Sequence, residues 1–366
     1  MRVEKLADEP LSFEGSIERS AMTFRLSRRA LVAALPMIAW SVHTRSARAD
    51  ATEAAPSLPG GAPVAAKTAS RVVQVTSDAY GVTATLELEH APFPAPGFAY
   101  RDPTVYVFIP HHHRIARDGS VSMLVHFHGH NSTAERAMTA HQLREQLYDS
   151  KQNAILVVPE IAVLAPDSAA GKLESQGGLQ AMLEDTLRTV AASQVRSATG
   201  LAAIPTGASI GKVCVSAHSG GYHAAACSLR FGGVPVHEVY LFDALYADVD
   251  AFKDWVLAAR GKPMGARHKL VSYFTEGRTE ANTRALFADL ARAGVVCMHE
   301  QVEGALSREE LTQAEAISIR TRVAHGAVTA ELNGLRDCLY ASTLRRRLRT
   351  SWFDAKTGAR PLERRR

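Results

Sequence analysis

Short apolar runs alternate along the chain with longer segments in which apolar residues recur at helical spacing. The first pattern predicts strands and the second predicts helices. The predicted strands cover residues 72–75, 82–88, 104–109, 121–127, 154–158, 213–215, 236–242, 270–274 and 295–299. The predicted helices cover 133–148, 179–190, a segment after 221, 252–260, 280–293 and a segment from 328. This alternation indicates an α/β fold, with a mostly parallel central sheet and helices on both faces.

Two segments between these elements are expected to shape a pocket. The loop 161–178 follows a strand, and such loops build ligand sites at the carboxyl edge of α/β sheets. Residues 303–324 carry a capping pattern, Ser307 with Glu310, which predicts an inserted helix that forms a lid. The lid side chains expected to face the pocket or a neighbouring loop are Leu306, Leu311 and Ile317.

The N-terminal residues 1–49 have the pattern of an export signal. Arginines precede an apolar stretch at 30–42, which is shorter than the roughly 20 residues that span a bilayer. A small-x-small cleavage sequence follows at 47–49. Residues 27–31 resemble a twin-arginine signal, and Met22 is a possible true start. We expect a periplasmic or secreted protein with no stable membrane span after processing; the alternative is an uncleaved N-terminal anchor.

The remaining sequence divides into three parts. Residues 50–70 are rich in Ala, Pro and Gly and predict a linker, 71–345 form the folded domain, and 346–366 form a basic tail. The formal net charge is +5, but the basic excess lies near the two ends of the chain. We therefore expect no nucleic-acid partner. Contact of the tail with an anionic membrane surface stays an alternative.

Cysteine and histidine patterns favour no metal site. Export would permit disulfides, but the cysteine spacings fit no metal motif and buried free thiols are the favoured interpretation. The cysteines are Cys214, Cys227, Cys297 and Cys338. Residues 111–113 are three adjacent histidines after a proline and predict a solvated turn. An alternative metal cluster of His126, His128 and His130 lacks a nearby carboxylate or cysteine.

The strongest chemical signal lies at residues 213–222. An apolar strand turns sharply through small residues into an Ala-rich helix, with Ser219 at the apex. Ala217 and Gly221 supply the small flanking residues that a close approach of strand and helix requires. This stretch resembles the nucleophile elbow of the alpha/beta-hydrolase superfamily, with Ala217 in place of the usual first glycine. The alternative is an ordinary glycine-rich turn.

A second resemblance to the same superfamily lies at the end of the strand 121–127. His128-Gly129-His130 follows that strand and precedes a helix, as the oxyanion loop does in these enzymes. The resemblance implies that the backbone amides of His130 and Gly220 form the oxyanion hole. Gly129 allows the turn, and His128 is expected to brace the loop.

The remaining members of a catalytic triad follow in the order that the superfamily uses, nucleophile, acid and histidine. Asp243 follows the strand 236–242, Glu276 follows the strand 270–274, and His325 precedes the last helix. We favour Asp243 as the acid because it lies immediately at a strand end, and Glu276 is the alternative. Glu276 is flanked by glycine and arginine and is expected to form a surface ion pair.

The resemblance implies a serine hydrolase without metal or organic cofactor. Ser219 would attack the carbonyl carbon, His325 would move the proton, and Asp243 would orient the imidazole. The expected substrate is a small-molecule or polymer ester. Three alternatives stay open: an amidase or peptidase on the same fold, a hydrolase-like protein without activity, and a metal-binding periplasmic protein.

Overall fold

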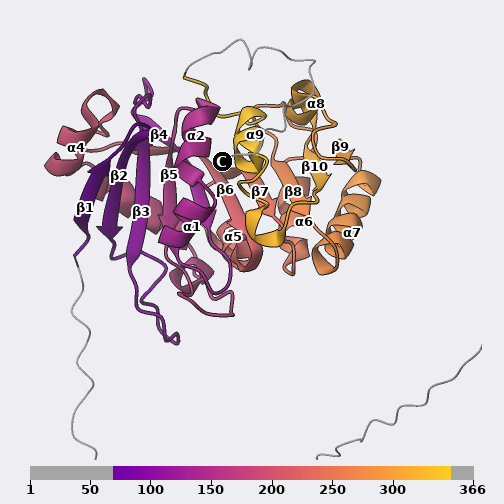
Figure 1. The fold of residues 1–366 in the computed structure, drawn as a ribbon, viewed down its shortest axis with the longest axis horizontal. Coiled ribbons are helices and arrows are strands. Elements are labelled where there is room, and N and C mark those ends of the chain that lie inside the picture. The colour runs from indigo at the N-terminus through magenta and orange to yellow at the C-terminus, as the bar shows by residue number, and fades with distance from the viewer. Residues whose placement is uncertain (1–68, 348–366) are drawn as a thin grey trace, which may run out of the picture. The chain divides into compact units, whose positions relative to one another are not determined.

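The computed structural model describes residues 69–347, so the predicted export signal, most of the predicted linker and most of the predicted basic tail lie outside the described residues. One ten-stranded sheet runs through this part of the chain (Figure 1). In spatial order its strands are β1 (Arg71–Ser77), β2 (Gly81–Glu87), β3 (Thr104–Pro110), β5 (Ala154–Pro159), β4 (Ser120–Phe127), β6 (Ser209–His218), β7 (Val236–Phe242), β8 (Lys269–Phe274), β10 (Ala316–Arg320) and β9 (Cys297–Glu300). Strands β5 to β9 in this order pair in parallel, and β1, β2 and β3 add an antiparallel edge.

Helices cover both faces of the sheet, and a separate hydrophobic cluster lies under each set. One face carries α3 (Gly178–Val190), α4 (Ser193–Thr199), α5 (Tyr222–Phe231), α6 (Val249–Ala258) and α7 (Arg278–Arg292). The other face carries α1 (Ala134–Ala140), α2 (Leu143–Ser150), α8 (Arg308–Gln313) and α9 (Gly334–Tyr340). Figure 1 shows α1, α2 and α9 together in front of the sheet. The predicted fold class, a mostly parallel sheet with helices on both faces, is confirmed.

Strand β7 shows why the sequences of the central strands are mostly apolar. Val239 and Leu241 pack into one cluster, while Tyr240 and Phe242 pack into the other. All four side chains are fully buried. A strand covered on both faces is therefore mostly apolar, and burying each large side chain stabilises the fold by about 1.5–3 kcal/mol. This packing fixes the end of β7, where Asp243 follows.

The helix predicted over residues 133–148 is two helices, α1 and α2. The break lies at His141 and Gln142, where Gln142 adopts a left-handed backbone with φ of 47°. The side-chain amide of Gln146 donates a hydrogen bond of 2.8 Å to the carbonyl oxygen of His141 and so satisfies a group that the break leaves free. The break turns the buried ring of His141 toward His126 on the sheet.

The prediction of a helical lid at 303–324 is wrong. The capping box of Ser307 and Glu310 is present, but it starts only the short helix α8. The following residues form β10, which pairs in parallel with both β8 and β9. Leu311 and Ile317 are buried in the core and Leu306 packs against the same cluster, so these side chains do not form a lid. β10 lies between β8 and β9 and pairs with both, and this pairing across the sheet outweighs the local preference for a helix.

The prediction of a solvated turn at 111–113 is wrong for two of the three histidines. His112 and His113 are buried, and only His111 is exposed. The ring of His113 lies 3.4 Å from the carbonyl oxygen of Ala202. Burial lowers the pKa of His113 to about 4, and the hydrogen bond to Ala202 offsets only part of that effect.

The four cysteines are free thiols, as predicted; three are buried and Cys297 is half-buried. Across residues 69–347, every helix is too short or too polar to cross a bilayer.

Burial of His113 predicts an acid-sensitive fold. The unfolded chain protonates this residue below about pH 6.5, whereas the folded chain keeps it neutral down to about pH 4. Stability is therefore lost as the pH falls through this window, by about 1.4 kcal/mol per pH unit for one such histidine. His113→Asn should make the dependence of the unfolding free energy on pH shallower by up to about this amount. Urea unfolding at several pH values measures it. The exposed neighbour gives the matched control, His111→Asn, which should leave the slope unchanged; equal slopes in both variants would contradict the assignment.

Candidate active site

Ser219 lies at the turn between β6 and α5, where sequence analysis placed a nucleophile. The turn is a short 3₁₀ segment, Ser219–Gly221, directly after the buried strand end. Ser219 has a φ of 50°, which is unusual for a residue with a side chain. The sharp, strained backbone holds the serine at the apex of the turn, half-buried at the carboxyl edge of the sheet.

Glycines are required at this turn because the chain segments nearly touch. A Cβ on Gly129 would lie 2.8 Å from the Cβ of Ser219, and a Cβ on Gly221 would lie 2.5 Å from the carbonyl oxygen of Phe127. Both distances are shorter than a side-chain carbon tolerates. The end of β4, which contributes Phe127, therefore packs directly against the serine turn.

Gly220 and the ring of His130 lie side by side. A Cβ on Gly220 would overlap the imidazole of His130. The Nε2 of His130 is 2.8 Å from the Oγ of Ser168, and the backbone amide of Asn131 donates to the carbonyl oxygen of Ala165 at 2.9 Å. The loop after β5 thus holds the His130 loop in place.

The contacts of His128 brace this loop. Its Nδ1 donates a hydrogen bond of 2.8 Å to the carbonyl oxygen of Gly129, and its Nε2 lies 2.7 Å from a carboxylate oxygen of Glu160. The second carboxylate oxygen of Glu160 accepts a hydrogen bond of 3.0 Å from the amide of Ala134, at the start of α1. Both side chains are buried, so the pair fixes the direction of the chain between β4 and α1. Sequence analysis did not identify Glu160.

Asp243 is held by a nearly complete set of hydrogen bonds. It follows β7, is 1% exposed, and accepts hydrogen bonds from His325 Nδ1 at 2.6 Å and Thr279 Oγ1 at 2.5 Å. Thr275 donates from its amide at 3.0 Å and its hydroxyl at 2.7 Å. Burial alone would raise the pKa of Asp243, but hydrogen bonds from His325, Thr279 and Thr275 outweigh it and lower the pKa to about 2. The carboxylate is therefore ionised at neutral pH.

The alternative acid, Glu276, points elsewhere. Its side chain is 88% exposed and lies 3.9 Å from the guanidinium of Arg320, in the surface ion pair that the sequence predicts. The structure brings Asp243 to His325 and leaves Glu276 outside this hydrogen-bond set. Sequence analysis did not identify Thr275 and Thr279, because threonine at a strand end or in a first helical turn has many ordinary roles.

A row of buried histidines leads from His325 into the protein. His218 donates from Nε2 to the main-chain oxygen of His325 at 2.9 Å, and the two rings are 4.8 Å apart. The ring of His141 lies 4.6 Å from that of His218, and its Nδ1 is 3.4 Å from His126 Nε2. Burial lowers the pKa of His218 to about 4 and those of His141 and His126 well below their usual value. These three rings are neutral at pH 7 and hold the loop that carries His325.

His325 contacts Asp243 directly, and the ring of His218 lies between the loop of His325 and the turn of Ser219. The Cβ position of Gly129 lies 2.8 Å from Ser219 and 3.0 Å from the ring of His218, whose neighbour is His325. Within the described residues, Ser219 Oγ makes no hydrogen bond. The arrangement offers a hydroxyl, a half-exposed imidazole and an ionised carboxylate that fixes the Nδ1–H tautomer of that imidazole.

The histidines of the alternative metal cluster are not brought together. His126 bonds to Ser216 Oγ at 2.7 Å, while His128 and His130 have the separate partners described above. Within residues 69–347, no group of three or more histidine, cysteine, aspartate or glutamate side chains is placed to hold a metal ion.

The positions of the elements complete the assignment of the fold. The serine turn follows β6, the acid follows β7, and the histidine follows β10, all on one mostly parallel sheet. Ser219, Asp243 and His325 thus each follow a strand of this sheet, in the chain order that is typical of the alpha/beta-hydrolase fold. The chain has an alpha/beta-hydrolase fold.

Several solved structures are similar to this chain at low identity. An S-formylglutathione hydrolase from Agrobacterium tumefaciens is 11% identical, with 70% of this chain and 92% of that chain covered and a TM-score of 0.35. A feruloyl esterase module from Clostridium thermocellum is 10% identical, with 74% and 87% covered and a TM-score of 0.40. Mycobacterium tuberculosis MPT51 is 11% identical, with 69% and 97% covered and a TM-score of 0.39. No family model and no curated protein matches the chain.

The packing at the serine turn predicts a sharp difference between two glycines. Gly221→Ala places a Cβ against two backbone oxygens, so the turn must shift, and overpacking of this kind costs about 1–3 kcal/mol. Gly326→Ala is the matched control, because its Cβ meets nothing within 4 Å although it is adjacent to His325. Urea unfolding of both variants measures the cost. Equal stability of the two variants would contradict the close packing described here.

Proposed function

We propose that this protein is a serine hydrolase that cleaves carboxylic esters through Ser219, His325 and Asp243. The observation that supports the proposal most directly is the 2.6 Å hydrogen bond between His325 Nδ1 and Asp243 Oδ2, beside a serine in a strained turn. A serine hydroxyl is a weak nucleophile until a base removes its proton. An imidazole whose Nδ1–H is held by a carboxylate presents Nε2 as that base.

In the first half of the reaction, His325 Nε2 takes the proton of Ser219 as the Oγ attacks the ester carbonyl carbon. The carbonyl oxygen gains negative charge, and the amides of Gly220 and His130 would donate hydrogen bonds to it. Loss of one such donor typically lowers the rate by about 10²–10³-fold. Asp243 stays ionised and stabilises the imidazolium.

In the second half, His325 returns the proton to the leaving-group oxygen and the carbon–oxygen bond breaks. An acyl group remains on Ser219. Water then attacks this acyl-enzyme, with His325 again as base, and releases the acid. All steps use side chains and amides of this chain.

We also propose that the protein is exported to the periplasm or secreted, based on the pattern of residues 1–49. N-terminal sequencing of the mature protein should start at Asp50, directly after the small-x-small sequence. Recovery of the apolar stretch 30–42 with a membrane fraction would contradict cleavage.

The choice of acid gives the sharpest test of the triad. Asp243→Asn should lower kcat for a p-nitrophenyl ester by about 10⁴-fold, because an amide at this position no longer favours the required imidazole tautomer. Glu276→Gln compares the alternative acid at the neighbouring strand end and should change kcat by no more than about tenfold, since its exposed side chain contacts Arg320 and lies outside the hydrogen bonds to His325. Thermal unfolding of both variants separates loss of catalysis from loss of fold. A nearly fully active Asp243→Asn enzyme would overturn the assignment.

A further inference from the structure

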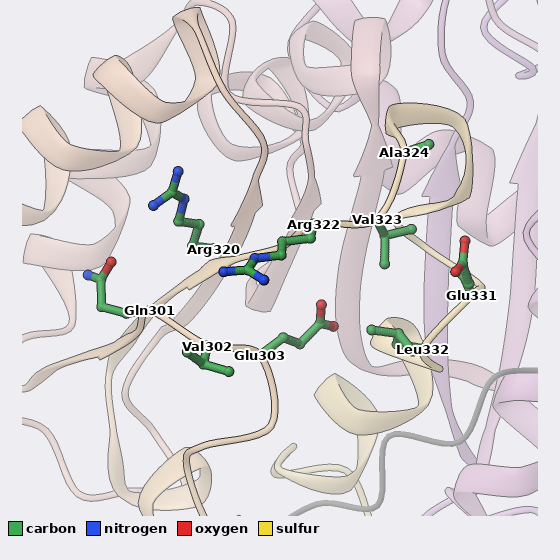
Figure 2. Close-up of a pocket in the computed structure, with 9 residues that line it drawn as sticks. All are labelled: Gln301, Val302, Glu303, Arg320, Arg322, Val323, Ala324, Glu331 and Leu332. Atoms are coloured by element: carbon green, nitrogen blue, oxygen red, sulfur yellow. The ribbon is translucent and has the colours of Figure 1, made fainter.

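A groove starts at His325 and follows the segment between β10 and the short helix that holds this histidine. The part next to His325 has a volume of about 470 Å³ and is lined by Thr275, Glu276 and residues 320–325. An adjoining part of about 540 Å³ is lined by residues 301–303, 320, 322–324, 331 and 332 (Figure 2). The two parts share Arg320, Arg322, Val323 and Ala324 in their lining, so they adjoin along this segment.

Two arginines lie along the shared wall of this groove. Arg320 ends β10 and Arg322 follows two residues later, while Thr321 between them is buried. Figure 2 shows both arginine side chains along the same stretch of chain. Arg322 is exposed and makes no ion pair within residues 69–347. Among the described residues, the one ion-pair contact of Arg320 is with the exposed Glu276 at 3.9 Å, and such a pair contributes little in water.

The acidic residues of the groove are distributed unevenly. Glu303 and Glu331 line only the part that is farther from His325. Glu303 accepts a hydrogen bond of 2.7 Å from the hydroxyl of Thr321, which holds it on that side. The part next to His325 is lined by Arg320, Arg322 and one acidic residue, the exposed Glu276. This end of the groove therefore carries a net positive charge.

Because the groove lies beside His325, it lies on the side where the leaving group of the substrate would bind. His325 donates a proton to the leaving-group oxygen in the proposed reaction, so the leaving group must lie on the side of His325. The groove begins at the His325 ring, so the part of the leaving group beyond its oxygen atom would extend into it. Val302, in the outer part of the groove, is 68% exposed and adds apolar surface that the leaving group can contact.

We infer that Arg320 and Arg322 form a subsite for an anionic group, a carboxylate or a phosphate, on the leaving group of the ester. Guanidinium groups bind such anions through paired, charge-assisted hydrogen bonds. The inference rests on the proposed function, because that function places the leaving group at His325. It adds a substrate class: esters of alcohols or phenols that carry a negative charge.

Matched acetate esters test the inference. Methyl 4-acetoxybenzoate is neutral, 4-acetoxybenzoate carries a carboxylate and 4-acetoxyphenyl phosphate carries a phosphate, with the same acyl group in all three. The ratio of kcat/KM for each anionic ester to that for the neutral ester should fall about tenfold in the double variant Arg320→Gln/Arg322→Gln. The larger fall identifies which of the two anions the subsite prefers. Arg117→Gln is the control and should leave both ratios unchanged. Arg117 is exposed and precedes the first residue of β4, whereas the active-site loop follows the last residue of β4.

A binding measurement separates the inference from the proposed function. In the Ser219→Ala background, titration calorimetry with 4-acetoxybenzoate should show affinity that the double arginine substitution weakens about tenfold. Unchanged ratios and unchanged affinity would overturn the subsite, while hydrolysis of the methyl ester would leave the proposed function standing. Arginine-dependent binding without hydrolysis of any ester by the unsubstituted protein would support the subsite and overturn the esterase function.

Discussion

The hydrogen bond between Asp243 and His325 is the interaction on which the site depends. A carboxylate that is 1% exposed is costly unless its oxygens are satisfied, and here two threonines and the imidazole satisfy them. The two threonines come from the end of β8 and the first turn of α7. The same bonds that make the buried charge tolerable fix its direction, so the acid is already oriented before any substrate binds. Preorganised polar groups of this kind cost no rearrangement during a reaction.

Other contacts at the same edge of the sheet fix the positions of the serine turn and the loop of His325. Gly129 and Gly221 let β4 and the serine turn approach more closely than side chains permit. The buried ring of His218 links the loop of His325 to the serine turn through a main-chain hydrogen bond. The serine turn, the loop beside it and the loop of His325 are thus joined by packing and by polar contacts.

The sequence predicted the fold well where the structure depends on local pattern. The central strands were predictable because strands covered on both faces are mostly apolar, as at residues 239–242 of β7. The segment around β10 was not predictable, because the capping box is a local signal and the need for a strand between β8 and β9 comes from the whole sheet. The strained turn at Ser219 was predictable because its small residues are adjacent in the chain.

Other parts of the site depend on contacts between distant residues. Asp243 and Glu276 both follow strands, and only their burial and the threonines around one of them separate the two. The histidine row joins residues 126, 141, 218 and 325, and no spacing along the chain connects them. The burial of His113 likewise depends on packing near Ala202, far away in sequence. Such groups carry no local signal because their partners are set by the fold.

The account depends most on the claim that Ser219 is an activated nucleophile. Fluorophosphonates form a covalent bond with activated serine hydroxyls and do not label ordinary ones. Mass spectrometry of the labelled, full-length protein should find one adduct, on the peptide that contains Ser219, and no adduct in the Ser219→Ala variant. An unlabelled folded protein, or an adduct at another serine such as Ser168, would contradict the account.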